Sequence, residues 1–407
     1  LIRDLIRRGA AVHCVMSQAA EQILHPYALE YASSNPVVRE ITGKVEHVQF
    51  CGVGGAADLL LVAPATANTI GKMACGIDDT AVTTFATTAL GSGKPVAVVP
   101  AMHEAMYRHP AVLRNLERLR EMGVLLIDPR LEEGKAKIRD NASIVWEVER
   151  LLGPGDLAGK RIVITSGSNA EAIDPIRILT NRASGKTGTA LALEVRRRGA
   201  EVVLVHRFIQ EIPVRQVYAE SAGEMLDVVL AEVEKGCHAL ISAAAVADYT
   251  LDRQAEKIKS GQDLSLHLTP TPKIIKKVRE AYPELKIVGA HFGNPWYEEA
   301  AEATRRNRNL YFDLSGSSLI KKENDPRFWA QWLWWTDAIG KPHMPKDAVP
   351  AWEKILFATD EGPEALIENI RRFNKALDAC GVDEATREKC YGLTMAKVFG
   401  IEVPGTK

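Results

Sequence analysis

Residues 181–188 combine glycines with polar and basic side chains, a composition suited to holding an anion. This stretch follows the β-branched run Arg161–Thr165 and precedes a helical pattern over Thr189–Arg198. A loop between a strand and a helix surrounds its guest with backbone N–H groups and the positive helix end. Small residues also occur in such turns for packing alone, but the amide and cationic side chains here favour a nucleotide or phosphorylated ligand.

Polar motifs also follow predicted strands in the first 152 residues. The strand candidates are Ala11–Met16, Leu59–Ala63, Pro95–Pro100 and Val124–Ile127. Helical spacing between them predicts a parallel sheet covered on both faces. Ser17, Asn68 and His103 come shortly after three of these strands, where ligands of parallel sheets bind.

The alternation continues beyond the Gly153-Pro154-Gly155 linker, with strands expected at 161–165, 201–205, 239–243 and 286–289. The predicted fold class is α/β, with a flavodoxin-like domain at 1–152 and a Rossmann-like domain at 158–289, both doubly wound parallel sheets. A partial (β/α) barrel-like tail is expected at 290–407. Because the chain opens on a helical pattern where such a domain has a strand, we expect the first strand to be lacking and the sequence to be a fragment.

Composition limits the function classes. The net charge of -1 gives no bulk attraction to nucleic acid or to an anionic membrane. No apolar run approaches the ~20 residues that span a bilayer. The six cysteines are scattered without a Cys-x-x-Cys pair, which is typical of a reducing compartment. We expect a cytoplasmic protein that acts on small molecules.

The motifs PATANT (Pro64–Thr69) and PAMHEAMY (Pro100–Tyr107) resemble those of the flavin-dependent cysteine decarboxylase family. His47 matches the active-site histidine of that family, where an imidazole can take a proton at neutral pH. The resemblance implies FMN as cofactor and His103 as a substrate-binding residue. It implies these cofactor-binding residues: Ser17, Thr66, Asn68, Thr83, Thr84 and Met102. The cysteine that bacterial members carry in a flap has no counterpart near Glu132–Lys137, which leaves Lys135 or water as the proton donor.

Lys160–Gly188, AAAVADY (Ala243–Tyr249) and EKIKS (Glu256–Ser260) extend the resemblance. About residues 1–289 resemble the bifunctional coenzyme A biosynthesis family, in which a phosphopantothenoylcysteine decarboxylase is fused to a phosphopantothenate–cysteine ligase. The implied substrates are phosphopantothenoylcysteine, phosphopantothenate, cysteine and CTP with Mg²⁺. The family implies a homo-oligomer, with trimers of the flavin domain and dimers of the ligase domain.

In the ligase family, phosphopantothenate attacks CTP to form an acyl-cytidylate, from which the cysteine amine displaces CMP. The resemblance assigns Asn181 to the acyl-cytidylate and Lys257 to the phosphate charge. Its substrate-binding residues are Asp248, Pro272, Lys273, Ile274 and Ile275. A lysine pair such as Lys257 and Lys259 is more often simply solvated, so only the resemblance supports this role. The two lysines that reach the triphosphate are replaced after Gly289, so we expect an impaired ligase.

The tail resembles the last part of an amidohydrolase-type barrel, in which His291 and Asp360 match metal-site positions. Zn²⁺ is the implied ion, although two ligands fall short of the three or four that zinc requires. Two alternatives stay open: a metal-dependent amidohydrolase or decarboxylase acting through the tail, and an inactive chimeric fragment. The aromatic run Phe328–Trp335 is interpreted as core packing or a subunit contact.

Overall fold

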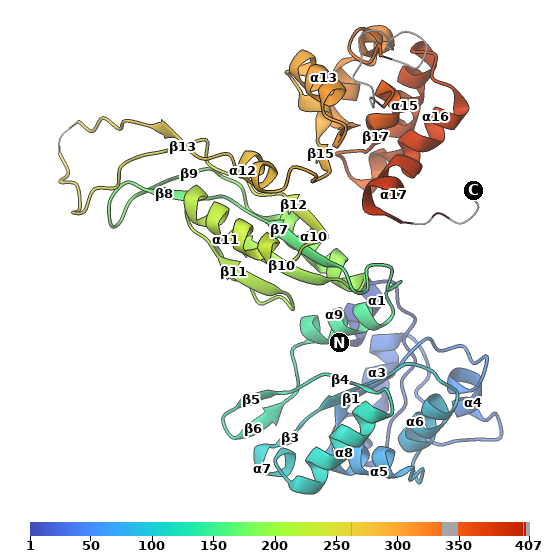
Figure 1. Cartoon of the computed structure of the whole chain (residues 1–407). Coiled ribbons are helices and arrows are strands. Elements are labelled where there is room, and N and C mark those ends of the chain that lie inside the picture. The colour runs from blue at the N-terminus through green and yellow to red at the C-terminus, as the bar shows by residue number, and fades with distance from the viewer. Residues whose placement is uncertain (262, 336–348, 402, 404–407) are drawn as a thin grey trace. The chain divides into compact units, whose positions relative to one another are not determined.

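The computed structural model describes residues 1–261, 263–335, 349–401 and 403. The chain divides into two compact units, Leu1–Ile275 and Lys276–Lys407. Both units contain parallel strands connected by helices, which confirms the α/β class (Figure 1). In the described residues, no helix is long and apolar enough to cross a membrane.

The first half of unit 1 is built on a parallel three-stranded sheet in the order β1-β2-β4. Alternate residues of β2 point to opposite faces, so Val98 joins the core beneath α5, α6 and α8, and Val99 joins the core that includes Ile144 of α9. The elements are α1 (Ile2–Arg7), α2 (Gln18–Glu21), α3 (Pro26–Ser33), α4 (Glu46–Cys51), β1 (Leu60–Ala65), α5 (Ala67–Cys75), α6 (Ala81–Gly91), β2 (Val96–Pro100), β3 (Met102–His103), α7 (Glu104–Tyr107), α8 (Pro110–Glu121), β4 (Leu125–Leu126), β5 (Arg130–Glu132), β6 (Lys135–Lys137) and α9 (Asn141–Leu151).

The strand predicted at Ala11–Met16 is wrong. This segment forms only an isolated bridge between Val15 and Val38, with the N–H of Met16 bonded to the carbonyl of Val38 at 2.9 Å. Cys14 and Met16 are buried, so the apolar pattern reflects side-chain packing. Its backbone pairs with a neighbouring loop instead of with the sheet.

The second half of unit 1 carries a parallel sheet in the order β11-β10-β7-β12. Numbered along the chain this order is 3-2-1-4, as in the first strands of a dinucleotide-binding sheet, whose ligands bind where the order reverses. The elements are β7 (Arg161–Thr165), β8 (Ala170–Ala172), β9 (Ile178–Thr180), α10 (Lys186–Arg197), β10 (Glu201–His206), β11 (Arg215–Tyr218), α11 (Ala222–Glu234), β12 (Ala239–Ser242), β13 (Tyr249–Thr250) and β14 (Thr269–Pro270). Helix α12 (Ile274–Ala281) begins at the end of unit 1, and most of its residues belong to unit 2.

The strand predicted at 286–289 does not join this sheet. Its observed counterpart β15 (Ile287–Gly289) pairs in parallel with β16 (Leu310–Leu314), and β16 pairs with β17 (Ile355–Phe357). Three strands in sequence order make up this sheet, so the expected partial barrel is not confirmed. The other elements of unit 2 are η1 (His291–Gly293), α13 (Tyr297–Arg306), α14 (Gly316–Lys321), η2 (Pro326–Gln331), η4 (Ala351–Lys354), η5 (Pro363–Ala365), α15 (Leu366–Ala379), α16 (Glu384–Glu388), η6 (Lys389–Leu393) and α17 (Thr394–Phe399).

Aromatic side chains form the core of unit 2. Trp329 and Trp335 are each 1% exposed and pack with Phe292 and Phe373 in one cluster. Core packing therefore explains most of the tryptophan run, although Trp334 stays 40% exposed.

Lys354 is also buried in unit 2, where its ammonium donates to the carbonyls of Thr304 and Asn307, each at 2.6 Å. These carbonyls end helix α13, so the lysine caps that helix. Burial lowers the pKa of Lys354 to about 8.

Glu232 of α11 stabilises the sheet of the second half. Its side chain is 4% exposed and accepts from Arg161 of β7, from Arg215 of β11 and from Lys235. Hydrogen bonding to Arg215 and to the other two cations lowers the pKa of Glu232 to about 2 despite burial. One carboxylate therefore joins two strands to the helix that covers them.

We expect Glu232→Gln to destabilise this sheet by about 3 kcal/mol, because three cations lose a buried partner. The stabilisation from the carboxylate is complete above pH ~4.5 and is lost as the pH falls toward ~2, since the folded pKa lies below the unfolded one. Amide hydrogen exchange of the β7 and β10 peptides measures the effect, with Glu234→Gln as the control on the same helix. Equal exchange in the two variants would contradict the assignment.

Candidate functional site

The strand-end motifs of the first half lie next to each other. Ala65 of β1 pairs with Pro100 of β2, and the N–H of Ala101 donates to the carbonyl of Ala65 at 2.9 Å. Thr66 then begins helix α5 by accepting from the N–H of Thr69. The structure thus brings the segment that carries Asn68 to the segment that carries Met102 and His103.

His47 lies on α4, which packs against α6. Its Nδ1 atom is buried and has no hydrogen-bond partner. Across the described residues, no hydrogen bond or ion pair joins His47 to Asn68 or His103. A buried ring nitrogen without a hydrogen-bond partner costs folding free energy unless a ligand or water binds it, so this atom can accept a hydrogen bond from a ligand or donate one to it.

Thr83 has a local role that the sequence interpretation missed. Its hydroxyl accepts from the backbone N–H of Thr80, while the hydroxyl of Thr80 accepts from the N–H of Thr83, so the pair forms a capping box at the start of α6. Thr83 is 2% exposed. The hydroxyl of Thr84 donates to the carbonyl of Thr80 at 3.0 Å. The Thr-x-x-Thr spacing at a helix start was the signal for this role.

A small antiparallel sheet places Lys135 beside His103. Strand β3 pairs with β6, with Met102 opposite Ala136 and His103 opposite Lys135, and β6 pairs with β5. Residues directly opposite on antiparallel strands project to the same face. The flap that lacks the family cysteine therefore sets an ammonium group next to a predicted substrate-binding histidine.

In the second half, three loops meet beyond the sheet. The N–H of Ala245, after β12, donates to the carbonyl of Gly167, after β7, at 2.8 Å. The Nδ2 of Asn181, after β9, donates to the carbonyl of Ala245 at 2.6 Å. Asn181 is thereby fixed at the carboxyl edge of β7 and β12, where the strand order reverses.

Helix α10 begins against this edge, and two glycines make the approach possible. Gly185 has a φ of +77° and precedes the helix without a side-chain cap. A Cβ at Gly188 would lie 2.4 Å from the Oγ of Ser166, so only glycine fits there. The N-terminal N–H groups of α10 are therefore directed toward the loop, as expected for anion binding.

The predicted substrate-binding residues Asp248 and Lys273 form an ion pair of 2.5 Å, although they are 25 positions apart. The hydroxyl of Thr271 donates to the carbonyl of Ala247, which holds the two segments together. Ile274 is only 5% exposed and Ile275 is 38% exposed, so Ile274 packs in the interior. Pro272 and Lys273 are the more accessible part of this loop.

Lys257 is exposed and lies at a different end of the β8–β9 hairpin from Asn181. Asn181 follows the last residue of β9, whereas Ile258 is bound by Asp174 and Arg177 in the hairpin turn. Hydrogen bonds and ion pairs of the described residues do not join Lys257 to Asn181.

In unit 2, His291 and Asp360 lie together, with 3.7 Å between Nδ1 and Oδ2. The same Nδ1 is 3.0 Å from the hydroxyl of Ser315, and Asp313 accepts from the backbone N–H of His291. Nevertheless, the described part of the chain contains no group of three or more His, Cys, Asp or Glu residues that could hold a metal ion. The implied zinc does not fit this donor set.

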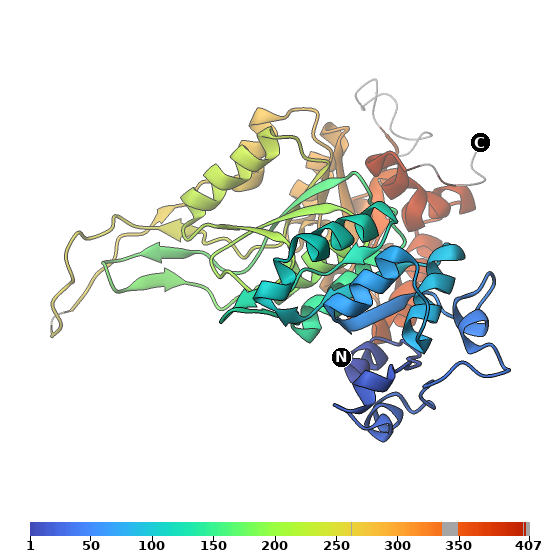
Figure 2. The ribbon, with the colours of Figure 1, turned by 90° about the horizontal axis from the view of Figure 1, so that it is seen from below.

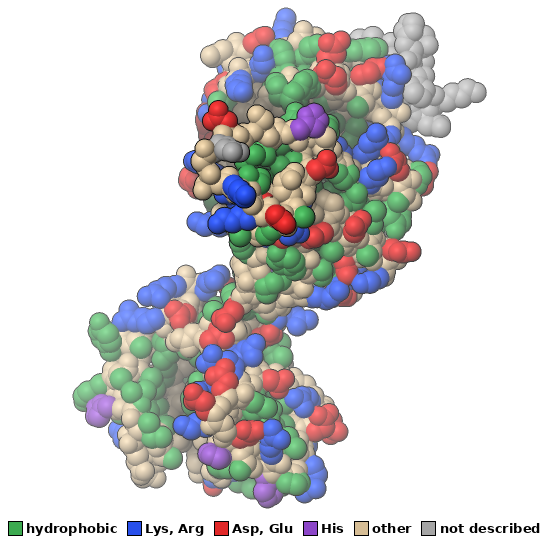
Figure 3. Space-filling view, turned by 90° about the vertical axis from the view of Figure 1, so that its left-hand side faces the viewer, with side chains coloured by type: hydrophobic (Ala, Val, Ile, Leu, Met, Phe, Trp, Pro, Cys, Tyr) green, Lys and Arg blue, Asp and Glu red, His purple; other side chains and the backbone are tan. Residues whose placement is uncertain are grey.

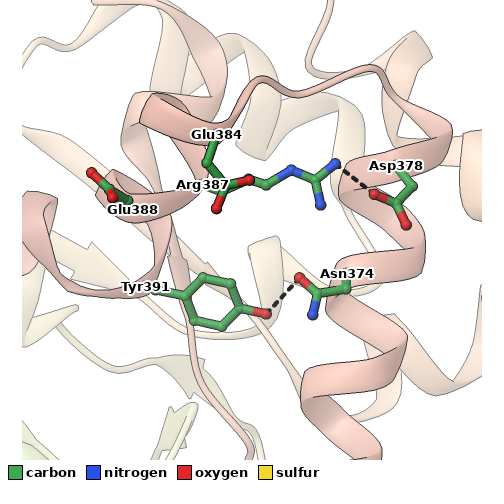
Figure 4. Close-up of a pocket in the computed structure, with 6 residues that line it drawn as sticks. All are labelled: Asn374, Asp378, Glu384, Arg387, Glu388 and Tyr391. Atoms are coloured by element: carbon green, nitrogen blue, oxygen red, sulfur yellow. Dashed lines mark hydrogen bonds and ion pairs between the residues drawn. The ribbon is translucent and has the colours of Figure 1, made fainter.

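A cavity of about 490 Å³ lies elsewhere in unit 2, between α15, α16 and η6 (Figure 4). Its polar groups bind one another, since Arg387 contacts Asp378 at 2.6 Å and Tyr391 donates to Asn374 at 2.9 Å. None of the predicted site residues lines it.

On the face of the molecule in Figure 3, cationic and acidic side chains are interspersed.

Three families match the chain. Flavoprotein matches residues 1–153, the DNA/pantothenate metabolism flavoprotein C-terminal domain matches 157–314, and Amidohydrolase matches 263–401. The coenzyme A biosynthesis bifunctional protein CoaBC of Thermococcus kodakarensis is 48% identical over 326 residues, which is 79% of this chain and 80% of the relative. The chain belongs to the CoaBC family.

The CoaBC protein of Methanocaldococcus jannaschii is 36% identical over 92% of this chain and 90% of its own length. The CoaBC protein of Escherichia coli is 34% identical over 76% of this chain and 80% of its own length. Among solved structures, the C-terminal domain of a CoaBC protein is 33% identical over 39% of this chain and 80% of its own, with a TM-score of 0.32. The FMN-dependent cysteine decarboxylase SpaF is 29% identical over 34% of this chain and 78% of its own chain, with a TM-score of 0.30.

We expect Thr83→Val to weaken the start of α6 by about 1 kcal/mol, because the capping box loses one hydrogen bond and leaves the N–H of Thr80 unpaired. Faster amide exchange across residues 80–86 measures the loss. Thr87→Val changes an exposed threonine of the same helix and should leave exchange unaltered. Identical exchange in both variants would show that the box contributes nothing.

Proposed function

We propose that this chain is a two-part enzyme of coenzyme A biosynthesis. The first part decarboxylates 4'-phosphopantothenoylcysteine to 4'-phosphopantetheine with FMN, and the second ligates cysteine to 4'-phosphopantothenate with CTP. The observation that carries the proposal is the 48% identity to a CoaBC protein across four fifths of both chains. The flavoprotein match to residues 1–153 and the pantothenate-metabolism match to residues 157–314 support our assignment of the first activity to the first range and of the second activity to the second.

The residues of the first half fit a flavin. The unpaired Nδ1 of His47 is buried, and the hydroxyls of Ser17 and Thr66 lie at helix starts, where an anionic phosphate is favoured. The side chain of Asn68 adds donors and an acceptor for ring edges. When bound, FMN supplies the redox chemistry that makes loss of CO₂ from a cysteine carboxyl feasible.

In this proposal His47 is the base that removes the substrate proton, and His103 binds the carboxylate end of the substrate. The pairing of Lys135 opposite His103 supports a role for Lys135 in adding a positive charge there and in returning a proton. Met102 is partly buried against the adjacent core and limits access of water.

We expect His47→Asn to lower CO₂ release at least about 100-fold while FMN remains bound, because general acid–base groups typically contribute about 10²–10⁴-fold. Flavin absorbance of the purified variant and trapped CO₂ are the two readouts. His109→Asn is the control, since asparagine can still cap α8 in place of the exposed histidine. Normal turnover by the His47 variant would remove His47 from the mechanism, and a wild-type protein that binds no FMN would overturn the proposed decarboxylase.

For the ligase half, we propose that Asn181 stabilises the acyl-cytidylate and that the ion pair of Asp248 and Lys273 borders the nucleotide. Mg²⁺ would accompany CTP as part of the substrate, with Asp248 as a carboxylate donor. The proposed role of Lys257, to supply charge to the phosphates, rests on the family resemblance, because Lys257 lies at the other end of the β8–β9 hairpin from Asn181.

We predict slow ligation, because residues 290–320, which follow Gly289 and belong to the second unit, contain no lysine to replace the two triphosphate-binding lysines of the family. Removal of one such electrostatic donor typically costs about 10²–10³-fold in kcat. The test compares CTP-dependent pyrophosphate release by this chain with that of a chimera in which residues 276–407 come from the Thermococcus kodakarensis relative. CO₂ release should be equal in both, and equal pyrophosphate release would refute the impairment.

The alternative, a metal-dependent hydrolase acting through the tail, rests on the Amidohydrolase match and on the proximity of His291 to Asp360. Because the donor set does not fit zinc, we derive no reaction step from it.

We further propose a homo-oligomer, supported by exposed Tyr27 and Tyr31 on α3. The six cysteines are all unpaired, which supports a proposal of a reducing compartment such as the cytoplasm.

A further inference from the structure

The segment that carries Lys257 lies along the turn between β8 and β9. In Figures 1 and 2 the β8–β9 hairpin and the segment between β13 and β14 project together from the same side of the sheet. The N–H of Gln254 donates to the carbonyl of Ile173 at 2.9 Å, and the hydroxyl of Thr250 donates to Glu171 at 2.6 Å. The hairpin therefore supports the lysine segment along its length.

Asp174 is the centre of this contact and is 2% exposed. One carboxylate oxygen accepts from the N–H groups of Ile176 and Arg177, at 2.9 and 2.8 Å. The other oxygen accepts from the N–H of Ile258 at 3.1 Å. Burial alone would raise the pKa of Asp174, but these backbone donors and Arg177 lower it to about 2, so it stays ionised at neutral pH.

Arg177 also binds Ile258, and we call the pair Asp174 and Arg177 the clamp. The Nη1 of Arg177 contacts Asp174 and also donates to the carbonyl of Ile258 at 3.1 Å. Both backbone groups of Ile258 are thus held by side chains about 80 positions earlier in the chain. Fixing a residue of an extended segment also fixes the directions of its neighbours, which here are Lys257 and Lys259.

We propose that Asp174, together with Arg177, is a positioning residue that sets the ammonium of Lys257 at the phosphates of the nucleotide substrate. This inference rests on the proposed ligase function. Asp174 contacts no substrate itself and acts through the backbone of Ile258. A displacement of about 1 Å in a charge-bearing group can cost about 10²-fold in rate. By fixing the backbone next to Lys257, the clamp gives this flexible side chain a defined position.

The test uses acetylation of lysines in the full chain with and without saturating CTP and Mg²⁺, read by mass spectrometry, because it requires no turnover. At about ten times Kd roughly a tenth of the sites stay free, so CTP should slow acetylation of Lys257 about tenfold in the wild type. In Asp174→Ala we expect less than about a twofold effect at Lys257, while protection of Lys273 persists, which reports an intact nucleotide site.

Two further variants separate positioning from folding. Asp174→Asn keeps one acceptor oxygen and should recover part of the protection, and Asp252→Asn, an exposed carboxylate of the same segment, should behave as the wild type. Full protection of Lys257 in Asp174→Ala would overturn the inference. Loss of protection at both lysines would assign Asp174 to folding and overturn it as well. Absence of protection at Lys257 in the wild type would instead show that the proposed role of Lys257 in the ligase is wrong.

Discussion

In each half of the first unit, a backbone hydrogen bond beyond the end of the sheet holds the strand-end loops together. In the first half the N–H of Ala101 meets the carbonyl of Ala65, and in the second the N–H of Ala245 meets that of Gly167. Both bonds lie at the carboxyl edge of parallel strands, where helices begin and unpaired N–H groups are concentrated. The segments that carry Asn68, His103 and Asn181 depend on these two attachments for their position.

The strand-end sites could be predicted because their signals are local. PATANT and PAMHEAMY each follow an apolar run, and the parallel arrangement then brings their ends together. The same reasoning failed at Ala11–Met16, where an apolar run packs its side chains without a strand partner, and at 286–289, where strand pairing is decided by the second unit. Hydrophobic pattern reports burial, but it does not report the partner of a strand.

The roles of residues with distant partners could not be predicted from the sequence. In the sequence Glu232 is a typical acidic residue of an amphipathic helix, and only the fold brings Arg161 and Arg215 to it. Asp174 is a turn residue in the sequence, and only the fold places Ile258 beside it. By contrast, the box formed by Thr80 and Thr83 was readable from spacing alone, but the family resemblance drew attention to other roles for Thr83.

The lysine buried beneath helix α13 has a consequence for how the two units respond to acidity. Lys354 is harder to protonate in the folded state than in the unfolded chain, so unfolding takes up a proton between pH ~8 and ~10.5 and this group favours the folded state as alkalinity rises. The carboxylate on α11 acts in the same direction but lower on the pH scale, since its contribution to stability rises between pH ~2 and ~4.5. The unit that contains Lys354 therefore loses stability as the pH falls from ~10.5 to ~8, where Glu232 stays ionised, and the sheet that Glu232 joins loses stability only below pH ~4.5.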